Sequence, residues 1–231
     1  MRYSELTEHS DEILTQDIAL KAIMTKCSDA YNAYISAGKP LFLRGVSQAT
    51  DEPHYFEKSG EKRPPAYYWG PDYYEHIFDG LPEWQGDIRR DLGLIGTTSA
   101  RKAMNYAGSK EQIFVVFPEN GAKIHVAPAD DWWNVKVADV PMKSYIDVVF
   151  TVFKKNSLSS LADLAASNRS AYKTIRKDLN PKNLGIKTIP SSKIGTLSQY
   201  SNNEIWTSAS CYALPIELWQ QINNKKFRKR F

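Results

Sequence analysis

Residues 93–117 read Gly-Leu-Ile-Gly-Thr-Thr-Ser-Ala-Arg-Lys-Ala-Met-Asn-Tyr-Ala-Gly-Ser-Lys-Glu-Gln-Ile-Phe-Val-Val-Phe, and this stretch decides the fold. It begins with the end of an apolar run at 92–95 that is typical of a strand, and Ser99 is a residue type that caps helix N-termini. We expect a helix over residues 100–106 that ends at Gly108, since glycine is common just past a helix. The β-branched and aromatic run at 113–117 predicts a second strand.

Upstream, residues 17–36 predict one amphipathic helix followed by a strand. Apolar residues recur there at spacings of three and four, which places them on one helix face. Gly38 and Pro40 end this helix, and the sequence Pro-Leu-Phe-Leu-Arg at 40–44 predicts a short buried strand. Residues 47–92 are rich in proline, glycine, tyrosine and charge, so we expect an irregular stretch with a short helix near 72–78.

Downstream of residue 117, strands predominate. The sequence Pro-Glu-Asn-Gly at 118–121 predicts a hairpin between the strand at 113–117 and one at 123–126. The β-branched run at 145–153 favours a strand, with a helix as the alternative, and residues 158–179 predict one or two helices. Further strands are expected at 188–194, 204–206 and 211–214. Helices early and strands late indicate an α+β fold rather than alternating βαβ units.

The composition is that of one globular domain over residues 1–231. The chain has 42% hydrophobic and 12% aromatic residues, with a net charge of +4, and this is enough apolar material for one full core. No apolar run reaches the roughly 18 residues of a membrane span, and the acidic, polar N-terminus lacks the features of a signal peptide. Cys27 and Cys211 do not make a disulfide framework, which favours a reducing, cytoplasmic location.

Three distant segments each place a polar group beside an apolar run. Arg44 follows the first run, the hydroxyl cluster at 97–99 follows the second, and Glu204 precedes the third. Each group also has an ordinary structural explanation. Arg44 can be one partner of a buried salt bridge, Ser99 can cap a helix, and Glu204 can be a solvated carboxylate at the start of a strand. Together, a guanidinium, small hydroxyls and a carboxylate can hold a dinucleotide and stabilise a cation that develops on its ribose.

In this order the segments resemble the Arg, Ser-Thr-Ser and Glu elements of the NAD-dependent ADP-ribosyltransferases. The expected helix with Ala103 and the ending Tyr-Ala-Gly at 106–108, followed by a strand, is similar to the middle third of such a domain. The resemblance covers about residues 40–215, and residues 145–187 have no clear counterpart in it. It implies an ADP-ribosyltransferase-like split β-sandwich core with an N-terminal helix and flanking helices.

The resemblance implies a mono-ADP-ribosyltransferase that cleaves NAD, releases nicotinamide and transfers ADP-ribose to a macromolecular acceptor. Arg44 would anchor the NAD phosphates or ribose, and Glu204 would stabilise the oxocarbenium-like transition state, as a carboxylate does in glycoside hydrolysis. This chain has Gly-Thr-Thr-Ser where the family has Ser-Thr-Ser, so the hydroxyl that matches the family's first serine stays open. The implied cofactor-binding residues are Arg44, Gly45, Thr97, Thr98, Ser99 and Tyr106.

Asn202 stands two residues before Glu204, where many family members carry Glu or Gln to orient the acceptor. An asparagine amide is shorter and cannot act as a base, so arginine is the acceptor we expect least. The basic tail at 223–231 and the aromatic residues at 67–74 suit a polynucleotide through phosphate attraction and base stacking. RNA or DNA is therefore slightly preferred over protein as the acceptor.

Two other functions remain open. An NAD glycohydrolase would use the same residues with water as the acceptor. A non-catalytic nucleic-acid-binding or phage structural protein would depend on the basic tail, and the chain also resembles uncharacterised bacteriophage-encoded proteins. Toxin-like family members further imply a neutralising protein partner. The four histidines and two cysteines lack metal-ligand spacing, so no metal site is predicted.

Overall fold

The computed structural model of the chain describes residues 11–46, 51–57 and 76–228. The strands are β1 (Asp11–Ile13), β2 (Leu43–Gly45), β3 (His54–Phe56), β4 (Leu94–Thr97), β5 (Ile113–Pro118), β6 (Lys123–Val126), β7 (Lys136–Val137), β8 (Val140–Pro141), β9 (Lys187–Pro190), β10 (Glu204–Thr207) and β11 (Cys211–Pro215). The α-helices are α1 (Gln16–Lys26), α2 (Ser28–Ala37), α4 (Ala100–Met104), α5 (Met142–Lys155), α6 (Leu161–Ser167), α7 (Arg169–Asp178) and α8 (Ile216–Arg228). The expected α+β class is confirmed.

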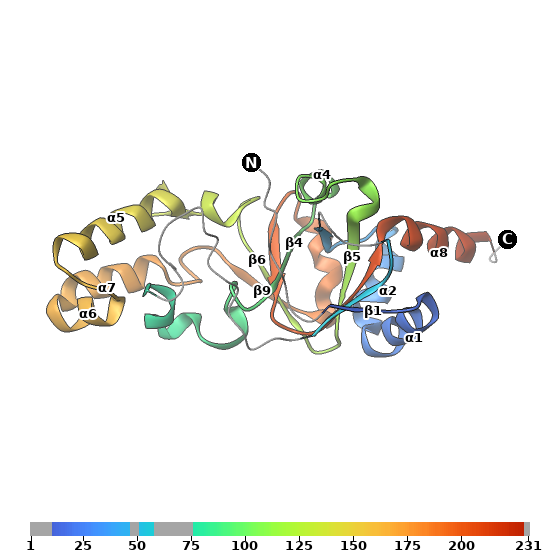
Figure 1. Cartoon of the computed structure of the whole chain (residues 1–231), viewed down its shortest axis with the longest axis horizontal. Coiled ribbons are helices and arrows are strands. Elements are labelled where there is room, and N and C mark those ends of the chain that lie inside the picture. Colours follow the sequence, from blue (N-terminus) through green and yellow to red (C-terminus); the bar gives the residue numbers. More distant parts are fainter. Residues whose placement is uncertain (1–10, 47–50, 58–75, 229–231) are drawn as a thin grey trace.

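One antiparallel sheet organises the described residues. Its nine strands lie in the order β1-β3-β11-β5-β2-β4-β10-β6-β9, and β7 and β8 form a separate two-stranded ribbon. Strands that are neighbours in the sheet are mostly distant in sequence. β4 lies between β2 and β10 in the sheet, and Figure 1 shows β4 near the centre of the molecule. Segments from the beginning, middle and end of the chain are therefore brought side by side.

The hairpin expected between β5 and β6 is wrong. β5 pairs with β2 and β11, whereas β6 pairs with β9 and β10. The turn between them instead carries the chain from one half of the sheet to the other. Asn120 N donates to Lys26 O at 2.7 Å, and Gly121, with φ of +84°, donates its N–H to Ser191 Oγ at 2.8 Å. These long-range contacts redirect the chain, and local turn chemistry does not reveal them.

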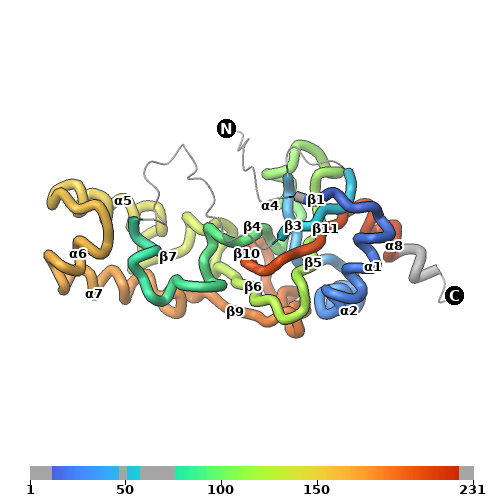
Figure 2. The backbone as a smooth tube through the Cα atoms, turned by 60° about the horizontal axis from the view of Figure 1, so that its bottom comes forward, coloured from blue at the N-terminus to red at the C-terminus, as the bar shows by residue number. Residues whose placement is uncertain are grey.

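Two hydrophobic clusters lie on either side of the middle of the sheet. The first packs α1, α2 and α8 with the strands around β5, and the second packs α5, α6 and α7 with the aromatic residues that follow residue 76. Figures 1 and 2 show α5–α7 at one end of the molecule and α1, α2 and α8 at the other. We call residues 142–187, which contain α5, α6 and α7, the helical lobe.

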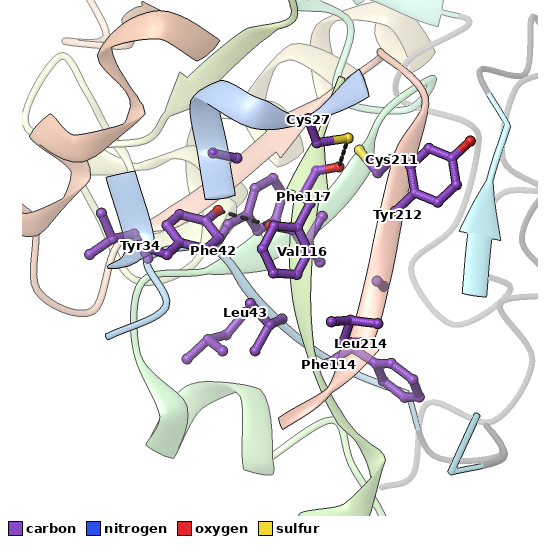
Figure 3. Packing of buried hydrophobic residues seen from close by; sticks show 14 of the residues in the cluster. Cys27, Tyr34, Phe42, Leu43, Phe114, Val116, Phe117, Cys211, Tyr212 and Leu214 are labelled. Carbon is purple, nitrogen blue, oxygen red and sulfur yellow. Dashed lines mark hydrogen bonds between the residues drawn. The ribbon is translucent and has the colours of Figure 1, made fainter. Parts of the chain in front are cut away.

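The first cluster holds β2 and β5 in place. The Tyr34 hydroxyl donates to Val116 O at 2.8 Å, and the Cys27 thiol donates to Phe117 O at 3.2 Å, so polar groups of the helices are satisfied inside an apolar core. Phe42 packs beside them on the chain leading into β2 (Figure 3). This packing fixes the start of β2 and therefore the position of the residues that follow it.

The single helix expected over residues 17–36 is two helices that meet at Cys27. The Cys27 N–H closes α1 by donating to Ile23 O at 3.0 Å, and its φ of −122° departs from helical geometry. The break turns α2 so that its tyrosines reach the core. α2 ends at Gly38, whose φ of +66° is the left-handed conformation typical of glycine after a helix, as the sequence predicts.

Of the two alternatives for residues 145–153, the favoured strand is wrong and the helix is correct, because these residues lie in helix α5. The buried residues Met142, Ile146, Val149 and Phe153 are four, three and four apart, which is a helical period. Their burial against the second cluster overrides the preference of β-branched residues for strands. Residues 158–179 form two helices, α6 and α7, which was one of the two expected arrangements.

Other boundaries differ by a few residues. The late strand expected at 188–194 is β9, which ends at Pro190 and continues into a 3₁₀ segment, Ser191–Gln199. The helix expected near 72–78 lies mostly outside the described residues, and a 3₁₀ turn occupies Phe78–Gly80. The aromatic residues at 67–74 and residues 229–231 also lie outside the described residues. The backbone of the expected tail is helical up to Arg228.

Candidate functional site

The three segments singled out from the sequence lie on adjacent strands, with Arg44 on β2, Thr97 on β4 and Glu204 on β10. Thr97 is the register partner of Leu43 on one side and of Glu204 on the other. Partners in an antiparallel ladder project from the same face, so the Thr97 hydroxyl and the Glu204 carboxylate leave the sheet side by side. The sheet therefore brings together residues that are far apart in the sequence.

Arg44 contacts the strand that carries the hydroxyls. Its side chain is nearly buried, and one terminal nitrogen donates to the carbonyl oxygen of Ile95, two residues before Thr97. Because Leu43 is the register partner of Thr97, the Arg44 side chain leaves β2 on the face of the sheet opposite to Thr97 and Glu204, and its guanidinium contacts the backbone of β4. Gly45 has a packing role, since a Cβ there would lie 2.0 Å from Ala103 O of α4. Close approach of the α4 backbone, rather than of a ligand, accounts for this glycine.

The three hydroxyls have different partners. Thr97 Oγ1 accepts from Ser99 N at 3.1 Å, and Thr98 Oγ1 accepts from Asn203 N at 3.0 Å. Ser99 is the N-cap of α4, because its Oγ accepts from Lys102 N at 3.4 Å. The ladder places Thr97 opposite Glu204, while Ser99 has the structural role of a cap.

Glu204 is held by Arg90, a residue that the sequence analysis missed. Arg90 Nε donates to Oε1 at 2.6 Å and a terminal nitrogen donates to Oε2 at 3.1 Å, while Trp132 N donates to Oε2 at 3.2 Å. Glu204 is only 5% exposed. The carboxylate is not the solvated group that its sequence context suggested. It is a nearly buried anion with a bidentate cationic partner.

The segment that carries Arg90 lies along one face of β10. Ser208 Oγ donates to Asp87 O at 3.3 Å, and Trp206 Nε1 donates to Ile88 O at 3.0 Å. Residues 204, 206 and 208 alternate with the strand period, so they share one face. Together with the Arg90–Glu204 pair, these hydrogen bonds make three contacts along that face. They fix the path of residues 87–90 and place Arg90 beside Glu204.

Arg89 anchors the same segment in a different direction. Its guanidinium pairs with Asp79 and Asp91, and its Nε donates to Asp91 Oδ1 at 2.6 Å. Arg89 and Asp91 are each 5% exposed. Because Arg89 is committed to these two carboxylates, its neighbour Arg90 projects toward Glu204. The sequence feature that could have indicated this ion pair is Arg-Arg-Asp at 89–91, shortly before β4. The local sequence does not indicate which of the two arginines pairs with Glu204.

Residues 129–132 close around the other side of Glu204. Glu204 N donates to Ala129 O at 2.9 Å, so this segment runs beside the start of β10. Burial raises the pKa of Asp131, and the negative charge of Glu204 adds to that effect, while the hydrogen bond from Trp133 N opposes it. Asp130 pairs with Lys102 of α4, and this hydrogen bond lowers the pKa of Asp130. The surroundings of Glu204 are therefore strongly charged and partly buried.

Asn202 lies in the turn before β10. It is exposed and has a φ of +65°, a left-handed conformation that asparagine adopts more readily than most residues. Its neighbour Asn203 makes the structural contact, donating from Nδ2 to Ala127 O at 2.8 Å. Tyr106 follows α4 and is 45% exposed. Asn202 thus projects from a well-anchored turn at the entrance to the Glu204 strand.

No known protein family, curated protein or solved structure matches this chain. Among the described residues, no group of three or more histidine, cysteine, aspartate and glutamate side chains is arranged to hold a metal ion. Within the same residues, no helix combines the length and the apolar composition that crossing a membrane requires.

Proposed function

We propose that this chain is an NAD-dependent mono-ADP-ribosyltransferase that acts on a macromolecular acceptor. The observation that carries the proposal is the register of β4 and β10, which pairs Thr97 with Glu204 on one face. Arg44 lies on the neighbouring strand β2 and contacts the β4 backbone from the opposite face. These three segments, chosen from the sequence for their combined chemistry, occupy adjacent strands, and this adjacency supports the proposal. An ADP-ribosyltransferase-like arrangement of the sheet is part of this proposal.

The chemistry of NAD cleavage gives each group a role. When nicotinamide leaves, positive charge develops on the ribose, and an oriented carboxylate such as Glu204 stabilises it. A carboxylate offers about four lone-pair positions, and the hydrogen bonds from Arg90 and Trp132 occupy three of them. One position is left for a ribose hydroxyl. Thr97 would orient that ribose, and Arg44 would donate to the diphosphate or to the adenosine ribose.

The turn before β10 supports a proposal for the acceptor. Asn202 is exposed and cannot remove a proton, so it would orient the acceptor by hydrogen bonding. This suits an exocyclic amine of a base or a protein side chain that needs no strong base. With water as the acceptor, the same residues would make the chain an NAD glycohydrolase, and free ADP-ribose without any labelled macromolecule would identify that activity.

One observation favours a non-catalytic protein instead. The Glu204 and Arg90 side chains are 7% and 16% exposed, and a bidentate pair this well covered also fits a purely structural ion pair. In that case the carboxylate would be needed for folding and NAD would not be consumed. The transferase and the non-catalytic protein predict different results for Glu204→Gln, which removes the charge but keeps the size of the side chain. Only the transferase predicts a loss of NAD cleavage.

The test is nicotinamide release from labelled NAD, with whole-cell lysate, RNA or DNA as the acceptor. Glu204→Gln should bind NAD yet lower the rate by about 10²–10³, the usual effect of losing one preorganised electrostatic group. Glu52→Gln, an exposed glutamate, is the matched control and should leave the rate unchanged. Circular dichroism of each variant checks the fold. If the parent chain releases no nicotinamide with any acceptor, the proposal is overturned.

A further inference from the structure

The helical lobe carries the excess positive charge of the chain. Residues 142–187 contain nine lysine and arginine residues but three acidic ones, whereas the whole chain has 30 basic and 26 acidic residues. Outside the lobe, acidic residues therefore outnumber basic ones. Charge of one sign collected on one part of a protein attracts ligands of the opposite sign. The nine basic residues are all exposed: Lys143, Lys154, Lys155, Arg169, Lys173, Arg176, Lys177, Lys182 and Lys187.

The acidic residues of the lobe are mostly engaged elsewhere. Asp163 closes the capping box of α6 by accepting from Ser159 and Ser160. Asp178 accepts from the Tyr145 hydroxyl at 2.8 Å. These two carboxylates contact neutral donors rather than the basic side chains. Because basic residues outnumber acidic ones in the lobe by nine to three, the lobe keeps a net positive charge.

Three of the basic residues form a stripe on α7. Arg169, Lys173 and Lys177 are four residues apart, so they lie one above another on the same helix face. Arg176 pairs with Glu83 at 2.7 Å. In the described part of the chain, by contrast, no carboxylate lies within 4.0 Å of the stripe nitrogens. A continuous row of unneutralised cations runs along this exposed face.

This stripe costs the helix stability. Like charges four residues apart repel each other, and Arg169 stands at the first position of α7, where the helix dipole is itself positive. The first turn of α7 contains no acidic residue to offset this. A polyanion lying along α7 would relieve both repulsions at once.

We propose that the stripe on α7 is the docking surface for a polynucleotide, held by its phosphate backbone. This inference deepens the proposed function. Only the claim that the bound polynucleotide is also the acceptor rests on that function. It assigns the binding to a different place from the basic tail. α8, which leads to that tail, lies at the opposite end of the molecule from the lobe (Figures 1 and 2).

The experiment measures binding of a labelled single-stranded 20-nucleotide RNA to the full chain by fluorescence anisotropy, at several salt concentrations and without NAD. The stripe variant carries Arg169→Gln, Lys173→Gln and Lys177→Gln. The control variant loses the same charge at three exposed lysines outside the lobe: Lys21→Gln, Lys39→Gln and Lys193→Gln.

The stripe variant should lose about two units from the slope of log affinity against log salt, since each phosphate contact on a single strand contributes about 0.7. Its affinity at 100 mM salt should fall about tenfold or more, and the control should keep the slope and affinity of the parent. Urea unfolding should show the stripe variant at least as stable as the parent, because removing the three charges relieves the repulsion.

Several results would overturn the inference. Equal losses in the two variants would mean that only net charge matters, and loss confined to a chain truncated before residue 223 would assign binding to the tail. No binding of the RNA by the parent at 50 mM salt, or binding only to anionic vesicles, would also refute it. Because NAD is absent, each of these results leaves the proposed transferase chemistry standing, and a failure to cleave NAD leaves the binding result standing.

Discussion

The Arg90 guanidinium meets the Glu204 carboxylate edge to edge, with Nε 2.6 Å from Oε1 and a terminal nitrogen 3.1 Å from Oε2. Two parallel hydrogen bonds allow one relative orientation of the two planar groups. Trp132 N contacts the same carboxylate at 3.2 Å. The direction in which Glu204 points is therefore set before any ligand arrives, which is what a carboxylate needs if it is to stabilise charge on a bound sugar.

Removing Arg90 should destabilise the fold. Arg90→Ala leaves the nearly buried Glu204 carboxylate without its cation, and breaking one side of a buried pair costs about 3–5 kcal/mol. Arg90→Lys keeps the charge but not the bidentate geometry, so its loss should be smaller. Urea unfolding measures both free energies.

A double-mutant cycle separates the pair from its surroundings. In Arg90→Ala combined with Glu204→Ala, neither charge is left unpaired, so the loss should be smaller than the sum of the two single losses. Additive losses would show that the two side chains do not depend on each other, which would contradict the contact as described.

Gly45 should not tolerate a side chain. A Cβ at this position would lie 2.0 Å from Ala103 O and 2.8 Å from Ala107 N, so α4 would have to move away from β2. Overpacking of this kind costs about 1–3 kcal/mol, and we expect Gly45→Ala to lower the urea midpoint accordingly. The control is Gly195→Ala, whose added Cβ would meet its nearest neighbour, Ala33 Cβ, at 3.8 Å. An unchanged midpoint in Gly45→Ala would refute the close packing of α4.

Stability should depend on pH through His125. This β6 residue is 2% exposed beside the Trp206 ring, and burial lowers its pKa to about 4. The unfolded chain, with a histidine pKa of about 6.5, then binds a proton that the folded chain does not. The free energy of unfolding therefore keeps its full His125 contribution above pH 6.5. It falls by about 3 kcal/mol as the pH drops from 6.5 to about 4.

The comparison of the parent chain with His125→Gln at pH 7.0 and pH 4.5 isolates this effect. Carboxylates whose pKa is lowered by hydrogen bonds, such as Glu83 and Asp163, also lose stabilising interactions in acid, but they do so in both proteins. The variant should therefore show a smaller drop in unfolding free energy between the two pH values. An equal drop would mean that His125 is protonated as readily in the folded chain as in the unfolded one.

Neither cysteine should react with a thiol reagent in the folded protein. Cys27 and Cys211 are fully buried, and burial raises the pKa of Cys27 to about 12 and that of Cys211 well above its ordinary value. The reactive thiolate is therefore scarce. With Ellman's reagent at pH 8 we expect no fast reaction in buffer and two thiols in guanidinium chloride. Fast labelling of either cysteine without denaturant would contradict the packing around α1 and β11.

Where a local rule decides the outcome, the sequence by itself determined the structure. Ser99 caps α4, Gly38 ends α2 in the left-handed conformation, and the run at 113–117 forms a buried strand, all as the residue types predict. The α+β class follows from the same signals. Sequence chemistry also selected Arg44, the hydroxyl cluster at 97–99 and Glu204 as a set, although nothing local could show that their strands are neighbours.

Only the tertiary structure decided which segments meet. The turn at 118–121 has the chemistry of a hairpin, yet β5 pairs with β2 and β11 while β6 pairs with β9 and β10, which are all distant in sequence from the turn or reached by long connections. Residues 145–153 favour a strand by composition but form a helix, because only a helix buries Met142, Ile146, Val149 and Phe153 together. Strand preferences span about 1 kcal/mol per residue, and burying one large apolar side chain contributes about 1.5–3 kcal/mol, so packing prevails. The position of Arg90 is also decided by the tertiary structure. Asp79 and Asp91 pair with Arg89, which leaves Arg90 to pair with Glu204, and these acids come together only once the chain is folded.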